Sequence, residues 1–426
     1  MNQDILTYYI KLKSLSLKNF RGAREMDISF DELLTVFIGN NGAGKSTVLD
    51  GLAYFLKYLE SLITGMGYNP NITGLKDLDV NIHASMAELN LEMALNDALH
   101  SLHIEINRDS FEIPVSSSEG DASIYELQTD VYEGLGKGQK MHLPVLAYYG
   151  ANSLMIRPDD IAGNEAIENE YRGIYNAYKN GLSASSFRFQ DFFRWFDLQQ
   201  KIGLQKGRNS KLDTVRVAIS AMLSEGDIAY GNLHVDWNET GDILELPKGE
   251  DRLNVLMLSS GEKTLLALVA DLARRLAIAN PHSNTPLTEG TGIVLIDEID
   301  LHLHPKWQRR VVPKLLEIFP KVQFVVTTHS PLVLGKIHSK HIRILDQGHV
   351  FGSDDTYGHD VSDILEDQMK VSGGIFDKDF EELFKLISDN QRELAVQRFT
   401  ELQQKIEGTT PDLVKAEHAL MRRNWL

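Results

Sequence analysis

Polar and apolar residues alternate along IKLKSLSLKNF, residues 10–20, near the start of the chain. This period of two predicts a half-buried strand. Residues 33–39 and 143–150 are almost continuously apolar, which instead predicts strands buried on both faces. Short segments of mixed pattern between residues 81 and 115 are typical of an antiparallel meander. The first part of the chain is therefore expected to contain strands of both kinds.

Apolar residues recur at helical spacing in several other segments. Helices are expected at residues 46–63, 186–206 and 212–224, and across the charged tail from residue 360 to 426. Two polar, glycine-containing segments, residues 116–123 and 133–140, are expected to be exposed loops. Strands and helices alternate again between residues 254 and 350, which is typical of a sheet covered by helices.

These patterns predict an α/β protein in three parts. Residues 1–151 and 227–350 together form the expected head, and residues 152–226 form a helical insertion within it. Residues 351–426 form a helical tail, which we interpret either as an element that docks a partner or assembles further copies, or as a lid packed on its own head. No heptad repeat is sustained, so a long coiled-coil arm is not expected.

The composition narrows the class of protein. The chain has 426 residues and no cysteine, which excludes disulfides, zinc fingers and thiol nucleophiles. Its first 15 residues lack the basic-then-apolar pattern of an export signal, and no stretch approaches the length of a membrane span. We therefore expect a cytoplasmic protein without membrane contact.

The formal net charge is −17, and a uniformly acidic surface repels DNA. Any contact with nucleic acid therefore needs a local basic patch. One candidate is the N-terminal set Lys11, Lys13, Lys18, Arg21 and Arg24. The other is a stretch that mixes bases with aromatic residues and contains Arg188, Arg194, Lys201, Lys206, Arg208, Lys211 and Arg216. The commoner meaning of such a charge run is a solvated helical face.

A glycine-rich loop follows the buried strand predicted at residues 33–39. Residues 39–46, GNNGAGKS, fit the pattern G-x-x-x-x-G-K-[ST], with a predicted strand before them and a predicted helix after them. In such a loop the backbone N–H groups point inward at phosphates, the lysine adds a positive charge, and the next hydroxyl can ligate Mg²⁺. The candidate ATP-binding residues are Gly39, Asn40, Asn41, Gly42, Ala43, Gly44, Lys45, Ser46 and Thr47.

Two acids end another buried strand. Residues 293–296 are apolar and are followed at once by Asp297 and Glu298. Ligands of α/β proteins bind at the carboxyl edge of the parallel sheet. There, Asp297 would hold Mg²⁺ together with Ser46, and Glu298 would polarise the water that attacks the γ-phosphate. Alone, this pattern also fits a strand that meets a solvated turn, but the upstream glycine loop favours the catalytic interpretation.

A third buried strand, in VQFVVTTHSP, delivers His329 to its end. A histidine at that position can donate a hydrogen bond to the γ-phosphate and sense its presence, although an isolated histidine after a strand is more often structural. His302 and His304 lie close to the acid pair in the sequence. Without cysteine or a matched acid cluster, we expect a structural role for both rather than metal binding.

The segment LSSGEK begins a helix between the glycine loop and the acid pair. Ser259 and Glu262 have the S-x-x-E spacing of a capping box. The helix behind them is expected to bury one apolar face, formed by Leu265, Leu268, Val269, Leu272 and Leu276. A well-capped helix is the simplest interpretation. However, Gly261 allows close backbone approach, and a helix N-terminus with serine hydroxyls also binds anions.

The order of these four motifs resembles that of ABC-type ATPase heads, in the branch of RecF, SMC, Rad50 and OLD proteins. The segment Asn19-Phe20-Arg21-Gly22 adds to this resemblance. The resemblance implies that two heads sandwich two ATP molecules. The signature residues Ser259, Ser260, Gly261 and Glu262 would then act on the ATP of the other copy. Glu298 would be the catalytic base, Asp300 would lie in the dimer-contacting loop, and His329 would be the switch histidine.

Three departures from the pattern bear on function. A glutamine usually follows the second core strand of such heads, but LAYYGANSL has none, and Gln128 is the nearest candidate. The insertion is too short and irregular for an SMC or Rad50 coiled coil. The nearest match to the acid pair of a TOPRIM nuclease, Asp377 and Asp379, opens a charged helix instead. This chain is therefore not expected to cut DNA by itself.

Compact heads with this kind of insertion resemble stand-alone ATPases of bacterial anti-phage systems, above all the Septu ATPase family, which works with a separately encoded HNH nuclease. The resemblance implies an ATPase with ATP and Mg²⁺ as ligands, a homodimer or higher homo-oligomer, and an HNH-type nuclease subunit that it regulates. The alternative is a RecF-like repair or replication ATPase that clamps DNA on ATP binding through the stretch from Arg188 to Arg216. A third possibility is an ATP-bound scaffold with negligible turnover.

Overall fold

The computed structural model describes most of the chain, namely residues 5–65, 77–108, 115–117, 122–151, 153–161, 173–182, 188–224, 228–238, 241–346, 348–353, 377–405, 411–423 and 425. The chain divides into two compact units, residues 1–359 and residues 360–426. Within the described residues, no helix combines the length and apolar character needed to cross a bilayer.

A six-stranded sheet forms the centre of the first unit, with the order β16-β15-β4-β14-β13-β9. Its strands are β4 (Leu34–Ile38), β9 (Val145–Tyr149), β13 (Gly292–Ile296), β14 (Val322–Thr327), β15 (Ile342–Asp346) and β16 (His349–Gly352). All neighbours are parallel except β15 and β16, which are antiparallel. Every residue of β4, β9, β13 and β14 is buried, as the continuous apolar runs predicted.

A second, antiparallel sheet has the order β3-β2-β5-β6-β7. Its strands are β2 (Ile10–Phe20), β3 (Ala23–Ser29), β5 (Met86–Leu95), β6 (Ala98–Asn107) and β7 (Val115–Ser117). The predicted alternation holds along β2 except for a register shift between Leu12 and Ser14, after which Leu15 and Leu17 again face the core. The meander predicted between residues 81 and 115 is confirmed as β5, β6 and β7. Two further short strands, β1 (Leu6–Thr7) and β8 (Met141–His142), pair in parallel.

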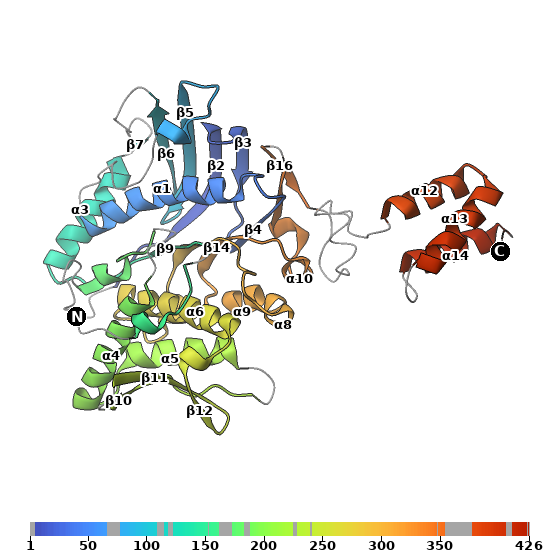
Figure 1. Ribbon diagram of the computed structural model, residues 1–426. Coiled ribbons are helices and arrows are strands. Elements are labelled where there is room, and N and C mark those ends of the chain that lie inside the picture. The colour runs from blue at the N-terminus through green and yellow to red at the C-terminus, as the bar shows by residue number, and fades with distance from the viewer. Residues whose placement is uncertain are drawn as a thin grey trace. The chain divides into compact units, whose positions relative to one another are not determined.

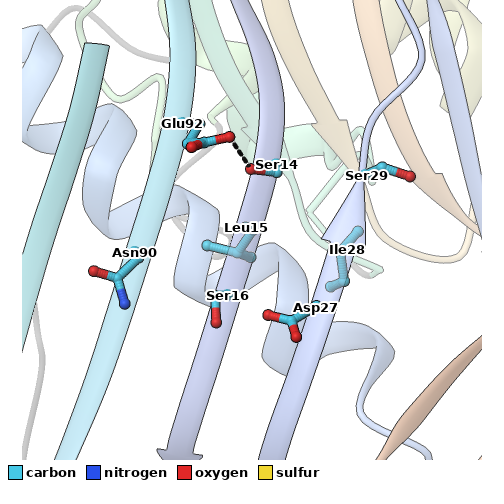
Figure 2. A pocket seen from close by; sticks show the side chains of 8 residues that line it. All are labelled: Ser14, Leu15, Ser16, Asp27, Ile28, Ser29, Asn90 and Glu92. Atoms are coloured by element: carbon cyan, nitrogen blue, oxygen red, sulfur yellow. Dashed lines mark hydrogen bonds between the residues drawn. The ribbon is translucent and has the colours of Figure 1, made fainter.

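The outer face of the antiparallel sheet carries a shallow polar groove of about 400 Å³ (Figure 2). It lies over β2, β3 and β5 and is lined by Ser14, Leu15, Ser16, Asp27, Ile28, Ser29, Asn90 and Glu92. Ser14 donates a hydrogen bond to Glu92, with an Oγ–Oε2 distance of 2.7 Å. The carboxylates of Asp27 and Glu92, without a basic side chain among the lining residues, make this groove unsuitable for a phosphate group.

Helix α1 (Lys45–Thr64) lies between the two sheets (Figure 1) and contacts strands of both. It is therefore buried on most sides, and Val48, Leu49, Leu52, Phe55, Leu56 and Leu59 are fully buried. Helix α3 (Ala122–Gly136) contacts α1. Its last residues, 133–136, belong to the segment that the sequence pattern assigned to an exposed loop. That assignment was wrong, because Leu127 and Val131 pack inward at helical spacing despite the glycines that follow.

Helix α6 (Ser260–Ala279) runs on the other side of the parallel sheet. Its predicted apolar face is buried, and so is most of the opposite face, because α5 (Ser210–Leu223) covers it. Asp271, in the middle of α6, accepts hydrogen bonds from Arg274, Arg275 and Tyr149. Burial raises the pKa of Asp271, but the two guanidinium groups outweigh it and hold that pKa at about 2. This ion cluster joins α6 to the end of β9.

The helical insertion contains α4 (Phe189–Lys206) and α5, and it packs on a small antiparallel sheet with the order β10-β11-β12. These strands are β10 (His234–Asn238), β11 (Gly241–Lys248) and β12 (Asp251–Asn254). The Gln200 side chain exchanges two hydrogen bonds with the backbone of Val235, at 2.7 and 2.9 Å, and so fixes α4 on β10. Helices α4 and α5 of the insertion contact α6 (Figure 1).

Short helices complete the first unit: α7 (Pro286–Glu289), α8 (Pro305–Gln308), α9 (Val311–Ile318) and α10 (Pro331–Leu334). Turns of 3-10 helix occur at residues 77–79, 158–160, 173–177, 255–257 and 339–341. The predicted boundary between head and tail at residue 350 falls inside β16, which pairs with β15 up to Gly352.

The second unit contains α12 (Asp377–Ser388), α13 (Arg392–Lys405) and α14 (Pro411–Arg422) among its described residues. These helices share an apolar core of Phe380, Leu383, Ile387, Ala395, Phe399, Leu402, Leu413, Ala416 and Leu420. Within the tail that the sequence predicts to be helical, the helix is interrupted at Asn390, whose φ of 62° is left-handed and tolerated by asparagine. The Asp379 carboxylate accepts a hydrogen bond of 2.6 Å from Arg398 in α13, so it serves to join two helices.

Candidate functional site

Three parallel strands end at one edge of the central sheet. The glycine loop follows β4, the acid pair follows β13, and Thr328 with His329 follows β14, which lies between the other two. The registers Phe324 to Leu34 and Ile296 to Val326 bring the three carboxyl ends together. A cavity of about 180 Å³ opens there, lined by Asn41, Gly42, Gly44, Lys45, Ser46, Thr47, Asp297, Glu298 and His329. The structure thus brings together side chains that sequence reasoning assigned to three separate motifs.

The glycine loop depends on backbone conformations that other residues rarely adopt. Gly42 and Gly44 have φ of 82° and 104°. Gly39 has a φ of 148°, and a Cβ atom built on it would lie only 2.2 Å from the backbone oxygen of Leu345 in β15. Only glycine therefore fits at position 39, where the loop leaves β4.

The ammonium of Lys45 lies against the loop that precedes it. Its Nζ donates hydrogen bonds to the backbone oxygens of Gly39, at 2.8 Å, and Asn40, at 3.2 Å. Burial lowers the pKa of Lys45, while the charges of Asp297 and Glu298 act in the opposite direction. With the N-terminus of α1 directly behind it, this loop is suited to hold phosphate groups.

Ser46 and Asp297 form the part of the site that fits a divalent cation. The Ser46 hydroxyl donates a hydrogen bond of 3.0 Å to Asp297 Oδ2, although the two residues are 251 positions apart in the sequence. A hydroxyl oxygen beside a carboxylate oxygen supplies the hard oxygen donors that Mg²⁺ prefers. The residues present therefore fit the predicted Mg²⁺ site.

Thr327 organises both acids. Its buried hydroxyl donates a hydrogen bond of 2.6 Å to Asp297 Oδ1 and accepts one of 2.7 Å from the backbone N–H of Glu298. Glu298 has a left-handed φ of 52°, which is unfavourable for a residue with a long side chain. Its side chain lines the cavity, so strain is stored at the position where a general base is expected.

Asp300 connects the turn after β13 to the residues after β14. Its carboxylate accepts hydrogen bonds from the Thr328 hydroxyl and, at 3.3 Å, from the backbone N–H of His329. Gln308 strengthens this link, because its amide donates to the Leu303 backbone oxygen and accepts from the Ser330 hydroxyl. A hydrogen bond thus joins Asp300, predicted to lie in the dimer-contacting loop, to the backbone of His329, the predicted switch histidine.

The two other histidines have local roles. The His304 ring accepts a hydrogen bond from the backbone N–H of Lys306 at the start of α8. His302 is exposed, with a left-handed φ of 63°. The His302 backbone oxygen approaches Gly261, where an added Cβ atom would lie 3.1 Å from it. The start of α6 therefore packs closely on the turn that contains Asp300.

The predicted capping box is confirmed at the start of α6. The Ser259 hydroxyl accepts a hydrogen bond from the Glu262 backbone, and the Glu262 carboxylate accepts one from the Ser259 backbone at 2.8 Å. Ser259 and Ser260 are exposed, and neither Gly261 nor Glu262 lines the cavity beside the glycine loop. Within one chain, this helix start therefore presents its hydroxyl groups to solvent rather than to the cavity.

Gln128 does not take the place of the missing glutamine. It is half-buried on α3 and is not one of the residues that line the cavity. The segment that directly follows β9 begins with Gly150 and Ala151, which border a small void next to Asp297.

Several bases of the two predicted basic patches form local ion pairs. In the N-terminal set, Lys13 pairs with Glu32, Lys18 with Glu88, and Arg21 with both Asp50 and Asp79. In the second stretch, Lys201 pairs with Asp197 and Arg208 with Asp213. Four aromatic residues of this stretch, Phe189, Phe192, Phe193 and Phe196, are buried in the core, so their rings are not available to stack on bases of DNA, and Trp195 is half-buried.

Fold and site together define the class of the protein. A mostly parallel sheet carries the glycine loop, a Ser–Asp pair and a glutamate at one edge, with an antiparallel sheet on the other side of α1 and a helix, α6, that begins with a capping box. This combination is an ATPase head of the ABC type, in the class of RecF and SMC proteins.

Comparisons with known proteins agree with this class. A family model described as "AAA domain, putative AbiEii toxin, Type IV TA system" matches residues 34–335. The chain is 31% identical to the retron Vc95 probable ATPase of Vibrio cholerae serotype O1 biovar El Tor, over 79% of this chain and 74% of that protein. It is 22% identical to the Septu protein PtuA of Bacillus thuringiensis, over 75% and 72% of the two chains. The chain therefore belongs to this AAA-domain family of ATPases.

Among solved structures, the SMC head bound to the C-winged helix domain of ScpA matches 81% of this chain and 96% of its own length, with 15% identity and a TM-score of 0.48. The recombination mediator protein RecF-ATPrS of the RecFOR pathway matches 81% of this chain and 99% of its own length, with 15% identity and a TM-score of 0.40.

The role of Thr327 can be tested by Thr327→Val, which removes the hydroxyl at nearly constant volume. We expect kcat for ATP hydrolysis to fall about tenfold or more, because Asp297 loses a donor and the Glu298 N–H loses its acceptor. Thr35→Val is the matched control, since Thr35 is also a buried strand threonine whose hydroxyl accepts a backbone N–H bond, from Asp31. Steady-state ATPase assays and thermal unfolding of both variants make the comparison. Equal losses of kcat in the two variants would contradict a specific role for Thr327.

Proposed function

We propose that this chain is the ATP-hydrolysing subunit of an anti-phage defence complex, and that two copies enclose two ATP molecules between them. In each composite site, one copy contributes its glycine loop, Glu298 and His329. The other copy contributes Ser259, Ser260 and Gly261. Glu298 accepts a proton from the attacking water, and His329 donates a hydrogen bond to the γ-phosphate.

One observation carries the dimer proposal: each chain has an open half-site and an exposed complementary element. The cavity at the glycine loop is about 180 Å³, smaller than the roughly 300–1,000 Å³ of sites that enclose a whole small molecule. The signature serines are exposed and do not line this cavity. A two-fold arrangement of identical copies would use each element to complete the site of the other.

Ser46 and Asp297 would hold Mg²⁺. When bound, the metal supplies electrostatic stabilisation of the charge that develops on the phosphate oxygens. The chain's own contribution is to keep Asp297 oriented through Thr327 and to place Lys45 beside the phosphates.

The defence role is supported by relatives whose names identify them as retron ATPases and as the Septu protein PtuA. We propose that the ATP-driven closure of the dimer restrains or releases a separately encoded HNH-type nuclease. The compact unit formed by residues 360–426 is the proposed docking element, because it has its own apolar core and is distinct from the ATPase head.

Mixing the purified chain with a candidate HNH nuclease, with and without ATP, tests this proposal. We expect the two proteins to co-elute in size-exclusion chromatography and the rate of DNA cleavage to change at least about tenfold on adding ATP, since a ligand shifts an equilibrium only by its differential affinity. A variant that ends at residue 359 is expected to keep ATP hydrolysis and lose the co-elution. If no complex forms and cleavage is insensitive to nucleotide, the nuclease role is wrong.

A DNA clamp of RecF type is the second candidate, and one surface favours it. The loop between α4 and α5 forms a concavity of about 270 Å³ lined by Gln199, Ile202, Gly203, Lys206, Gly207, Arg208, Asn209, Ser210 and Lys211. Two of its three bases, Lys206 and Lys211, add to Arg208, which pairs with Asp213, on a chain with a net charge of −17. In the same experiment, ATP-dependent binding of duplex DNA by this chain alone, weakening steeply with salt, would favour the clamp.

A further inference from the structure

The Glu262 carboxylate has more partners than a capping box requires. One oxygen, Oε2, accepts hydrogen bonds from the Ser259 backbone N–H at 2.8 Å and from the Ser259 hydroxyl at 2.7 Å. The other oxygen, Oε1, accepts a hydrogen bond from Lys248 Nζ at 2.9 Å and a short one from the Tyr230 hydroxyl. One carboxylate thus divides its two oxygens between the signature turn and residues outside it.

Tyr230 and Lys248 are themselves held side by side. They form an antiparallel bridge, the Gly231 N–H donates to the Pro247 backbone oxygen at 2.8 Å, and the Lys248 ammonium lies 5.2 Å from the centre of the Tyr230 ring. This extends the small sheet β10-β11-β12 by one short pairing. The two side chains therefore reach Glu262 as one unit.

Helix α5 of the insertion fixes the backbone of Tyr230 from the other side. The Ser220 hydroxyl donates to the Tyr230 backbone oxygen at 2.9 Å, and the Tyr230 N–H donates to the Ser224 hydroxyl at 3.0 Å. A continuous set of hydrogen bonds thus runs from α5 through Tyr230 to Glu262 and then to Ser259. A displacement of the insertion must therefore act on the signature turn.

The charges of Glu262 and Lys248 strengthen the hydrogen bonds described above. Burial raises the pKa of Glu262, but the hydrogen bonds from Lys248, Tyr230 and Ser259 outweigh it and hold that pKa at about 2. The same contacts raise the pKa of Lys248 above its usual value. The folded-state pKa of Glu262 is lower than the pKa of a glutamate in the unfolded chain. The stabilisation from the contact between Glu262 and Lys248 is therefore fully present at a pH above the ordinary pKa of glutamate, and it is lost as the pH falls toward 2.

We propose that Glu262, Lys248 and Tyr230 form a positioning clamp, through which the insertion and its small sheet set the geometry of the signature serines. This inference rests on the proposed composite ATP site, in which those serines face the γ-phosphate of the other copy. The clamp residues do not touch nucleotide. They keep the Ser259 hydroxyl in one orientation and hold the start of α6 at a fixed distance from the sheet, so a partner that moves the insertion changes the rate of hydrolysis.

Substitutions of Lys248 and Tyr230 can distinguish a positioning role of these residues from a general effect on the stability of the fold. Lys248→Gln replaces the ammonium with a shorter, neutral amide, Tyr230→Phe removes the hydroxyl donor to Oε1, and both leave the capping box in place. We expect each to lower kcat about tenfold or more, as expected for loss of charge-assisted hydrogen bonds that fix a catalytic element. The Kd for mant-ATP, a fluorescent ATP analogue, should change less than about twofold, because the glycine loop of the same chain is intact. Lys248→Arg keeps the charge and donor and should restore kcat to within about threefold of the unmodified chain.

Two control variants use the same small sheet. Glu245→Gln lies on β11 three residues before Lys248 and removes one charge from the pair with His234. Trp237→Phe, on β10, removes an indole donor to Asp197 and keeps an aromatic ring. Both variants are expected to keep kcat within about twofold, since neither residue contacts Glu262. Thermal unfolding of all five full-length variants shows whether a lower kcat merely follows a lower Tm.

The results of these experiments show whether the clamp proposal or the composite-site proposal is wrong. If Lys248→Gln and Tyr230→Phe hydrolyse ATP as fast as their controls while Ser260→Arg is inactive, the clamp is wrong and the composite site stands. If Ser260→Arg is also fully active, the composite site itself is wrong. Loss of mant-ATP binding in parallel with kcat would also overturn the clamp, because it would place the defect in the glycine loop.

Discussion

Glu298→Gln is expected to lower steady-state ATP hydrolysis about 10²–10⁴-fold while ATP binding is retained, because the variant keeps the shape of the side chain and loses its ability to accept a proton. Lys45, Ser46 and Asp297, which line the same cavity, are unchanged. ATP that is bound but not hydrolysed should keep two copies together. The variant should therefore elute as a dimer on size-exclusion chromatography with ATP, whereas the unmodified chain should return to smaller species as ATP is consumed.

The control for this experiment is Glu317→Gln, an exposed glutamate on α9 that pairs with Lys314. It removes the same charge far from the cavity and should leave kcat unchanged within about twofold. A small loss of hydrolysis in Glu298→Gln, comparable to this control, would contradict the assignment of Glu298 as general base. That result would favour an ATP-bound scaffold whose slow turnover does not depend on this residue.

Backbone strain at Glu298 offers an independent check on the same assignment. A left-handed φ of 52° costs free energy in a glutamate. Such a conformation persists only where several contacts from the surrounding structure hold it. Here the Glu298 N–H donates a hydrogen bond to the Thr327 hydroxyl, and the Ile299 N–H donates one of 3.0 Å to the Thr327 backbone oxygen. The β14 strand thus holds the glutamate in a position that its own conformational preference disfavours.

The parts of the site that could be predicted from the sequence are those with local signals. The glycine loop, the acid pair and the capping box each lie within ten consecutive residues, and the continuous apolar runs before them identify buried parallel strands. That the three strand ends meet at one edge follows from the general arrangement of parallel sheets. The structure confirms this arrangement through the direct hydrogen bond between Ser46 and Asp297.

Residues that act across the fold could not be predicted in the same way. Thr327 and Gln308 gain their roles only when β14 pairs beside β13 and α8 folds back on the turn after β13. Tyr230 and Lys248 reach Glu262 only through pairing of the small sheet. Nothing in the residues around any of these positions indicates the contact.

The aromatic residues of α4 show the opposite case. Their spacing in the sequence already indicates burial, whereas the DNA-clamp alternative treats them as part of a binding surface. Phe189, Phe192, Phe193 and Phe196 follow the spacing i, i+3, i+4 and i+7, which is the pattern of a buried helical face. The structure buries them in the core of the insertion. These four buried rings are therefore not available to stack on the bases of DNA.

Two inactive variants are expected to restore each other when mixed, which tests the composite site directly. Lys45→Ala removes the ammonium beside the glycine loop, and Ser260→Arg places a bulky side chain on the exposed signature turn, so each variant alone should hydrolyse almost no ATP. In a mixed dimer, the intact glycine loop of the Ser260→Arg copy faces the intact signature of the Lys45→Ala copy. An equimolar mixture should therefore recover about one quarter of the original activity, because half of the random dimers are mixed and each contains one complete site.

A mixture of Lys45→Ala with Glu298→Gln is the matched control, because no pairing of these two copies contains a complete site. Each defect lies on the glycine-loop side of the copy that carries it. This mixture should stay inactive at any ratio, whereas the mixture with Ser260→Arg should peak near equal amounts. Steady-state phosphate release across a series of mixing ratios makes the measurement. If the Ser260→Arg mixture stays as inactive as the control while exchange of copies is shown by size-exclusion chromatography, the signature acts within its own chain and the composite site is wrong.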